Sequence, residues 1–425
     1  MRMSYGSLTA ALASAVSLAA LAAPATAAEI TFWHHTYPPA DELIQEKAAE
    51  YMAEHPDVTI RFQDEPHGDY EVKLLASIAA GNPPDIVNLL DYLFPQYATR
   101  GILAPLDPEA FGQESMDAVR EMYMPAALSG LTIDGTTYGV PEEFNTLALF
   151  INGDHMRDIG LDPDDPANYP ETWDDLFTLA EKLQVVEDDG TVSRLGFNWV
   201  WNLDPYWYAQ QYWPILQQYD CDVIGEDGKA AINSEACVQA FSDTWLHLID
   251  SGLGGPHLAT VNPVNALEDF STGRQSMAIA GIWAPPLYSE EVQDAYVVAP
   301  LPQRDPANPE TLLNSYALAV SAESEYPEVA WDFLRYLVSD SDAYLERAGY
   351  VTGIRGWADS EVAQRTKGSQ VFAEGQKHGS FVWRSPTWTE EGSAIKSAIE
   401  QFAQGVPVQD ALDQAAAQID VIRSR

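Results

Sequence analysis

Two adjacent histidines, His34 and His35, follow Trp33 in the segment ITFWHHTY. Paired imidazoles could hold a metal ion, act in catalysis, or line a pocket beside the indole. A metal site needs three or four ligands in tight geometry, and the sequence offers these histidines no H-E-x-x-H motif and no cysteine partner. Adjacent strand residues point to opposite faces. We therefore predict no metal and no cofactor, with one ring packed or hydrogen-bonded to backbone and the other, together with Trp33, at the rim of a ligand pocket.

Two adjacent carboxylates, Glu142 and Glu143, could serve as the acid and base of a glycoside hydrolase. Hydrolysis requires two carboxylates that face each other across the glycosidic bond, about 5 to 9 Å apart, and neighbouring strand residues do not supply that geometry. Walker A, G-x-S-x-G and dinucleotide-binding motifs are also missing. We predict a protein without catalytic residues and keep the hydrolase as an alternative. The sequence leaves open whether Glu142 contacts a ligand or caps a turn.

The chain is rich in aromatic residues, with 12 tryptophans and 20 tyrosines. Sugars present apolar C–H faces edged by hydroxyls, so a sugar site combines aromatic planes with carboxylates and amides. Aromatics gather between residues 197 and 219, where Asp204-Pro205 opens a predicted helix. Trp199 and Trp201 precede this helix, and we predict that they contact the ligand. The aromatics inside the helix are expected to pack in the core: Trp207, Tyr208 and Trp213.

The segment 1–27 has the pattern of a secretory signal peptide. Arg2 precedes an apolar run over residues 8–23, and Ala-Thr-Ala at 25–27 matches the small residues read by signal peptidase. A membrane anchor is the alternative, but the run is rather short and rich in alanine. We expect a soluble, exported, periplasmic protein that begins near Ala28. No cysteine lies near the cut, so we expect no lipid anchor.

The formal net charge is −42, from 64 acidic and 22 basic residues. Nucleic acid and anionic membranes are therefore poor partners. The acids are spread along the chain, and we interpret them as a solvated surface suited to high salt, where screening weakens self-repulsion.

The two cysteines of the chain, Cys221 and Cys237, flank a predicted hairpin with an Asp227-Gly228 turn. An oxidising compartment permits a disulfide, so we predict a bridge, with two reduced buried thiols as the alternative.

The elements that must position these side chains follow from the hydrophobic pattern. Residues 30–90 read as β-α-β-α-β, and a second α/β set follows from residue 147. Strands separated by helices predict a parallel sheet with right-handed crossovers. Ligands of such sheets bind beyond the carboxyl ends of the strands, which makes Asp91 and Tyr92 candidate contacts in addition to the residues that end the first strand.

Nine segments follow one another in a characteristic order: FWHH, AGNPPDIV, GILAPLD, YGVPEEFNTLALFIN, PETWDDL, FSTGRQSMAIAGIW, APLPQ, EVAWDFLRYL and AGYVTGIRG. With this series the chain resembles the family 1 extracellular solute-binding proteins, the maltose-binding-protein type that serve ABC importers. One departure is Ile151-Asn152, where the family usually has Tyr-Asn. The resemblance implies an α/β, two-lobed periplasmic-binding-protein fold of type II, with ligand held in the cleft.

The resemblance further implies discontinuous lobes joined by hinge strands. The implied division is a signal peptide at 1–27, an N-terminal lobe of 28–145 plus 303–350, and a C-terminal lobe of 146–302 plus 351–425. The implied crossings lie near 145–146, 301–303 and 350–353.

The family's stacking tryptophans fall at Trp283 and Trp388, and members often offer a polar group at the position of Asn145. Tyr316 and Arg355 complete the candidate ligand-binding residues, although Arg355 could instead pair with one of the many acids. The resemblance implies a carbohydrate ligand and an ABC transporter permease in the inner membrane as partner, and we expect a monomer. A polyol, a glycerol phosphate or a compatible solute is the alternative ligand. An anionic ligand is disfavoured, since Arg355 is the only arginine or lysine among the candidates.

Overall fold

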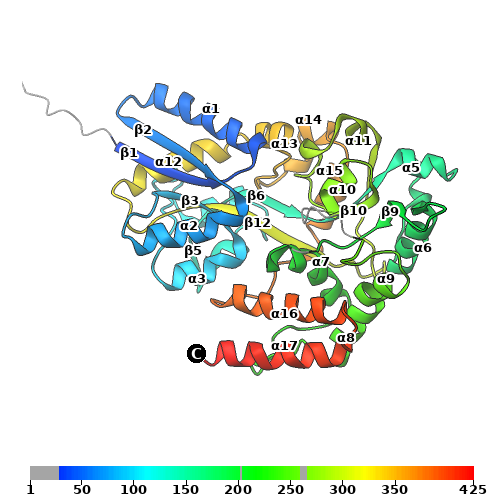
Figure 1. Ribbon diagram of the computed structural model, residues 1–425. Helices are drawn as coiled ribbons and strands as arrows, with labels where there is room; N and C mark the ends of the chain where they lie inside the picture. Colours follow the sequence, from blue (N-terminus) through cyan, green and yellow to red (C-terminus); the bar gives the residue numbers. More distant parts are fainter. Residues whose placement is uncertain (1–27, 202, 259–265) are drawn as a thin grey trace, which may run out of the picture.

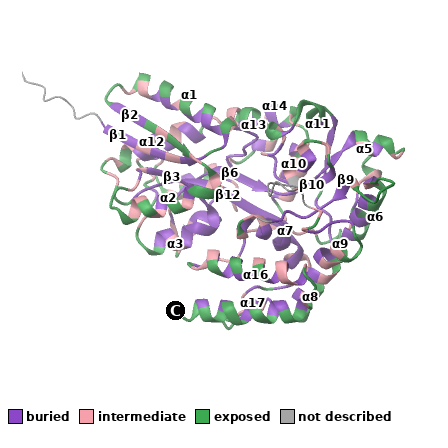
Figure 2. Cartoon of the chain, viewed as in Figure 1, coloured by how far each residue is buried: buried purple, intermediate pink, exposed green. Residues whose placement is uncertain are grey.

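The structure, a computed structural model, describes residues 28–201, 203–258 and 266–425, so the expected signal peptide lies outside the described residues. Two α/β halves lie side by side, each built around its own sheet (Figure 1). The strands and the inner faces of the helices are buried, and the outer helix faces are exposed (Figure 2).

The first sheet has the order β13-β12-β3-β1-β2, with β6 paired to β12. β1 pairs in parallel with both β2 and β3, which confirms the predicted parallel β-α-β-α-β unit. β12 runs antiparallel to β3 and β6. Its strands are β1 (Ala28–His35), β2 (Val58–Glu65), β3 (Ile86–Leu90), β6 (Val140–Thr146), β12 (Thr311–Val320) and β13 (Gly379–Ser380).

The helices of this half lie on both sides of the sheet, with α1 above it and α2 and α3 below it in the view of Figure 1. α12 and α13, which come from late in the chain, pack on α1. The helices are α1 (Pro38–Glu54), α2 (His67–Ala79), α3 (Phe94–Thr99), α4 (Met116–Met122), α12 (Pro327–Val338) and α13 (Ser341–Ala348). A two-stranded ribbon, β4 (Thr132–Ile133) with β5 (Thr136–Thr137), lies outside the main sheet.

The second sheet has the order β11-β7-β10-β9-β8. α6 (Trp173–Leu183) begins at a capping box formed by Thr172 and Asp175. Gly196 of β9 allows α6 to lie close to the sheet, because a Cβ there would come within 2.0 Å of the Ala180 carbonyl oxygen. The strands are β7 (Ala148–Asn152), β8 (Val185–Val186), β9 (Val192–Phe197), β10 (Gln275–Ala280) and β11 (Tyr296–Ala299).

The remaining helices surround this second sheet and the join between the halves. α16 and α17 lie one above the other beneath α7 in Figure 1, with α8 at their right-hand end, and α16 packs on both α7 and α17. They are α5 (Gly153–Asp158), α7 (Pro205–Gln218), α8 (Glu235–Phe241), α9 (His247–Asp250), α10 (Ala266–Ser271), α11 (Glu290–Ala295), α14 (Glu361–Arg365), α15 (Ser369–Gly375), α16 (Trp388–Phe402) and α17 (Val408–Arg423). A π-helical turn at Ser242–Leu246 joins α8 to α9.

The chain passes between the two sheets at short connections. Only Leu147 separates β6 from β7, and residues 300–310 connect β11 to β12. No helix in the described ranges is long and apolar enough to cross a membrane.

The predicted disulfide is confirmed. Cys221 and Cys237 are bonded, with their Cα atoms 5.0 Å apart. Between them, Ile224 pairs with Ala230 across the predicted turn, and Gly228 takes a φ of +77° that suits glycine.

Candidate functional site

A cavity of about 450 Å³ lies between the two halves. Its size is within the range of small-molecule sites. The first half contributes His35, Tyr37, His67, Glu143, Asn314 and Tyr316. The second half contributes Trp207, Gln210, Glu268, Trp283, Leu287 and Tyr288. Tyr350, from the segment after α13, completes the wall. A molecule in this cavity therefore contacts both halves at once.

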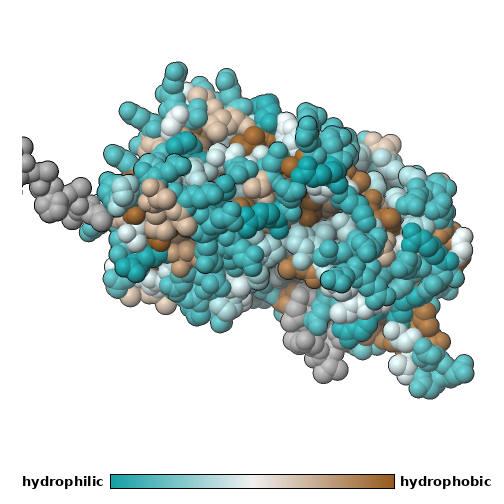
Figure 3. Space-filling view, turned by 90° about the horizontal axis from the view of Figure 1, so that it is seen from above, coloured by the Kyte–Doolittle hydropathy of each residue, from teal (hydrophilic) through white to brown (hydrophobic). Residues whose placement is uncertain are grey.

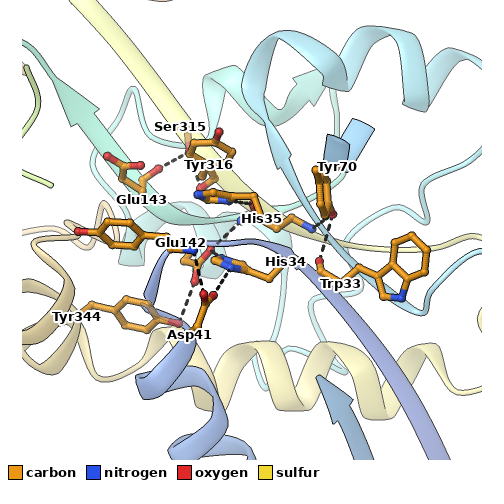
Figure 4. A network of polar contacts seen from close by, with 12 residues as sticks. Trp33, His34, His35, Asp41, Tyr70, Glu142, Glu143, Ser315, Tyr316 and Tyr344 are labelled. Carbon is orange, nitrogen blue, oxygen red and sulfur yellow. Dashed lines mark hydrogen bonds and ion pairs between the residues drawn. The ribbon is translucent and has the colours of Figure 1, made fainter. Parts of the chain in front are cut away.

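A buried charged cluster supports the wall from behind (Figure 4). His34 donates from Nδ1 to Asp41 Oδ1 and from Nε2 to Glu142 Oε2, each over 2.9 Å. Burial disfavours the charged imidazole, but the neighbouring Glu142 and Asp41 outweigh that effect and raise the pKa of His34 to about 9. His34 is therefore a cation at neutral pH, held between two carboxylates.

His35 lies at the cavity wall and is tied to the same cluster through Asn88. His35 Nδ1 donates to Asn88 Oδ1 over 2.6 Å, and Asn88 Nδ2 donates to Glu142 Oε2 over 2.7 Å. On its other face His35 stacks on Tyr316, with ring centroids 4.0 Å apart. Burial and the charge of His34 hold the pKa of His35 well below its ordinary value, so this ring is neutral.

The expectation that the two histidine rings are separated on opposite faces of the strand is wrong. Their centroids are 4.6 Å apart and the rings are stacked. His35 is the last residue of β1, where the regular alternation of side chains between the two faces ends. His34 binds Glu142 and His35 binds Asn88, and these two partners are themselves joined by a hydrogen bond. The hydrogen bonds of His34 also go to side chains and not to backbone.

A β-bulge orients the two adjacent glutamates. Glu143 lies opposite Tyr316 in β12, but Pro141 lies opposite Ala317, which leaves Glu142 without a strand partner. Bulges change the direction of side chains at such points. Glu142 joins the buried cluster, and Glu143 lines the cavity. Burial and the nearby Glu142 raise the pKa of Glu143 to about 8, although a hydrogen bond from Asn145 Nδ2 opposes this shift.

Aromatic rings form much of the remaining wall. Trp283 meets Trp207 edge to face, with centroids 5.9 Å apart. Tyr37 stacks on Tyr350 at 4.9 Å, and its hydroxyl lies 2.8 Å from the carbonyl oxygen of Trp283 and 2.7 Å from that of Ala348. The hydroxyl shares its one proton between these two acceptors, and so links the first half to the second.

A second, smaller cavity of about 140 Å³ adjoins the first and shares His35, His67 and Tyr316 with it. Tyr92 and Trp388 line it and pack on each other with centroids 4.2 Å apart. It extends the site from the main cavity toward the start of α16.

Asp91 lies behind this second cavity. Its Oδ1 accepts from the backbone N–H of Ser315, and its Oδ2 is 3.6 Å from Arg384 Nη1. Burial raises the pKa of Asp91 to about 6, against the attraction of Arg384. Asp91 lines neither cavity, so the structure gives it a supporting position.

Residues 37–344 match the bacterial extracellular solute-binding protein family. The chain belongs to this family. It is 24% identical over 466 residues to the lactose-binding protein of Rhizobium radiobacter, with 98% of this chain and 99% of the relative covered.

Solved structures agree with the fold. A solute-binding protein of an ABC transporter from Thermotoga lettingae, bound with α-D-tagatose, aligns at a TM-score of 0.80 and 22% identity, covering 93% of this chain and 99% of the other. UgpB of Mycobacterium tuberculosis in complex with glycerophosphocholine aligns at a TM-score of 0.79 and 18% identity, covering 93% of this chain and 98% of the other. The predicted α/β, two-lobed fold of type II periplasmic-binding proteins is confirmed.

Five of the candidate residues predicted for this solute-binding protein line one of the two cavities. They are His35, Tyr92, Trp283, Tyr316 and Trp388. Glu142 and His34 form the charged cluster behind the wall, and Asn145 holds Glu143.

The structure corrects the placement of Trp199 and Trp201. Both are almost fully buried in the second half, where Trp199 stacks on Trp245 at 4.9 Å and Trp201 meets the same ring edge to face. Trp207, which the sequence assigns to the core, instead lines the cavity. The burial of Trp199 and Trp201 results from the contact of both indoles with Trp245, in the π-helical turn before α9, and the local sequence pattern does not show this contact.

Two further candidates lie away from the cavity. The indole of Trp33 points away from His34 and His35, and its carbonyl oxygen accepts from the Tyr70 hydroxyl (Figure 4). Arg355 lies in a shallow groove beside α4 and donates from Nε to the carbonyl oxygen of Glu121. Neither residue lines the cavities that join the halves.

The sequence also missed several wall residues. Trp207 and Gln210 are three residues apart in the first turns of α7 and so share a face, which is a signal that could have found them. His67 begins α2 after β2, at the edge where ligands of parallel sheets bind. Tyr37 and Tyr350 carry no such local signal. In the described part of the chain no group of three or more His, Cys, Asp or Glu side chains is arranged to hold a metal ion.

Proposed function

We propose that this solute-binding protein captures a sugar or small oligosaccharide between its halves and delivers it to the permease of an ABC transporter. The observation that carries the proposal is the cavity itself, which is lined by indole and phenol rings together with two carboxylates and two amide side chains. Flat rings suit the C–H faces of a sugar, and the polar groups suit its hydroxyls.

Ligand binding and lobe closure are coupled in this proposal. A ligand favours the closed state only through contacts that the open state lacks. A sugar held between Tyr316 of one half and Trp283 of the other makes such contacts. We propose lobes of 28–145 plus 303–350 and 146–302 plus 351–425, which move about their connections as hinged periplasmic binding proteins do.

The names of relatives support this ligand class and also its alternative. One relative is named for lactose and one solved neighbour holds α-D-tagatose, whereas UgpB holds glycerophosphocholine. A phosphate group would need a basic cluster. Neither arginine nor lysine is among the described residues that line the two cavities, which favours the sugar.

The remaining expectations complete the proposal. Family members are extracytoplasmic binding proteins, and the relatives carry the names of binding proteins, not enzymes. We propose a periplasmic monomer, exported by a signal peptide at 1–27, without a lipid anchor or catalytic activity.

A thermal-shift screen against a panel of neutral mono- and disaccharides tests the proposal, since a ligand that binds only the folded state raises the melting temperature.

Trp283→Ala should weaken binding of the best sugar by roughly one to a few kcal/mol without unfolding the protein. Trp33→Ala is the matched control, because that indole points away from the site. Equal affinity in Trp283→Ala and wild type would remove Trp283 from the site, and release of shorter sugars from an oligosaccharide would replace the binding function with hydrolysis.

A further inference from the structure

The main cavity has acidic side chains in its wall but no basic counterpart to them. Glu143 and Glu268 line it from opposite halves, and no arginine or lysine is among its described lining residues. The other ionisable groups there are His35, His67 and tyrosines. Burial lowers the pKa of both histidines, so they are neutral at pH 7. An anionic solute meets no compensating charge in this wall.

Glu143 has no cationic partner in the described part of the chain. Its neighbour Glu142 has the imidazolium of His34, whereas Glu143 accepts one hydrogen bond over 3.0 Å from the neutral amide of Asn145. Arg384 pairs with Asp91. A buried carboxylate without a counter-charge is costly, and it is relieved either by taking up a proton or by a cation brought to it.

Aromatic faces surround this carboxylate. Tyr37 and Tyr350 line the same cavity as Glu143, and these two rings are stacked with only 9° between their planes. Trp283 and Tyr316 continue the wall. Ring faces carry the negative part of the aromatic quadrupole and attract ammonium groups.

We propose that the solute carries an amino or quaternary ammonium group, which binds beside Glu143 and against these rings, and that Glu143 sets this preference. The inference rests on the proposed function and narrows it to an amino sugar. A quaternary ammonium solute has the same recognition chemistry and is separated from the amino sugar by experiment.

Binding of a cation should release the proton that Glu143 holds. The ionisable groups around Glu143 are Glu142 beside it in β6, Tyr206, and the other ionisable side chains of the cavity wall, which are His35, Tyr37, His67, Glu268, Tyr288, Tyr316 and Tyr350. The tyrosines stay protonated at neutral pH because their pKa values are raised, and Glu142 stays paired with His34. Glu143 is thus the group whose proton the cation displaces.

Isothermal titration calorimetry of the full exported chain tests the proposal with glucosamine, N-acetylglucosamine, glucose and choline as probes. We expect glucosamine to bind at least tenfold more tightly than glucose and N-acetylglucosamine at pH 6.5, and to release up to one proton in paired buffers of different ionisation enthalpy. Tighter binding of choline than of any sugar would support the inference and contradict the sugar ligand. Neutral sugars that bind as tightly as glucosamine would overturn the inference and leave the proposed function standing. Absence of binding by both cations at millimolar concentration would also overturn it.

Glu143→Gln provides the decisive variant, because glutamine keeps the shape and can still accept from Asn145. It should reduce the affinity for the cation at least tenfold, abolish proton release and so remove the preference for glucosamine over glucose. Glu114→Gln, an exposed position with the same change in charge, is the matched control. Glu268→Gln is a second test from the opposite half and should also reduce cation affinity. Unchanged cation affinity in both folded variants would contradict the proposal.

Discussion

At the residue scale, the adjacent side chains of Glu142 and Glu143 have different electrostatic environments. Glu142 is neutralised by His34, which it shares with Asp41, whereas Glu143 faces the cavity without a cation. The difference arises from the bulge that removes Glu142 from the ladder. The chemistry of the site therefore depends on one irregular residue in β6.

The His34 cluster leads to a prediction about stability. His34→Gln leaves Asp41 and Glu142 buried without their cation and should lower the free energy of unfolding at pH 6 by about 3 kcal/mol or more. The folded pKa of His34 is raised from 6.5 to about 9, so its contribution is fully present below pH 6.5 and is lost as pH rises through 9. Urea denaturation of variant and wild type should therefore give a difference that shrinks over this range.

The matched control for that prediction is His378→Gln. His378 contacts Glu374 over 3.2 Å on the surface, where such a pair contributes little. A constant difference between His34→Gln and wild type from pH 6 to pH 9.5 would show that the charge of His34 does not stabilise the fold.

At the element scale, the order of strands and helices could be predicted because the apolar period changes clearly between them. Which tryptophans lie in the core and which line the cavity could not be predicted. Trp199 is buried by Trp245, a residue of the π-helical turn far along the chain. Trp207 lines the cavity from α7, a helix that packs on α16 and β12. Both outcomes depend on packing between elements and not on local pattern. The bulge at Glu142 also could not be predicted from the local sequence, since no turn residue marks it.

The disulfide segment gives a prediction at this scale. The bridge between Cys221 and Cys237 closes a loop whose hairpin contacts α17, where Asp420 Oδ1 accepts from the Ala230 N–H over 2.8 Å. Closing a loop of about 15 residues contributes about 3 kcal/mol in the chain-entropy account. Replacing both cysteines by alanine should lower the free energy of unfolding by about that amount. Reductant should reproduce this loss in the wild-type protein and have no effect on the double variant. An unchanged denaturation midpoint in both the double variant and the reduced wild-type protein would contradict the prediction.

At the scale of the whole molecule, the excess of acidic residues determines the charge of the surface. The face seen from above in Figure 3 is mainly hydrophilic. Ion pairs on this molecule use the few cations available, such as Arg61 with Glu29 and Arg347 with Glu46, and the 22 basic residues cannot pair with 64 acids. Most carboxylates therefore repel one another across solvent.

This repulsion predicts that salt stabilises the protein. The Debye length falls from about 10 Å at 0.1 M to about 3 Å at 1 M salt, which screens repulsion between exposed carboxylates. The melting temperature at pH 7.5 should rise when sodium chloride increases over this range, and the rise should shrink near pH 4, where carboxylates take up protons. Sucrose at matched osmolality controls for general solute effects. A melting temperature that falls with salt at pH 7.5 would mean that the surface ion pairs, and not the net repulsion, dominate the electrostatics of the folded state.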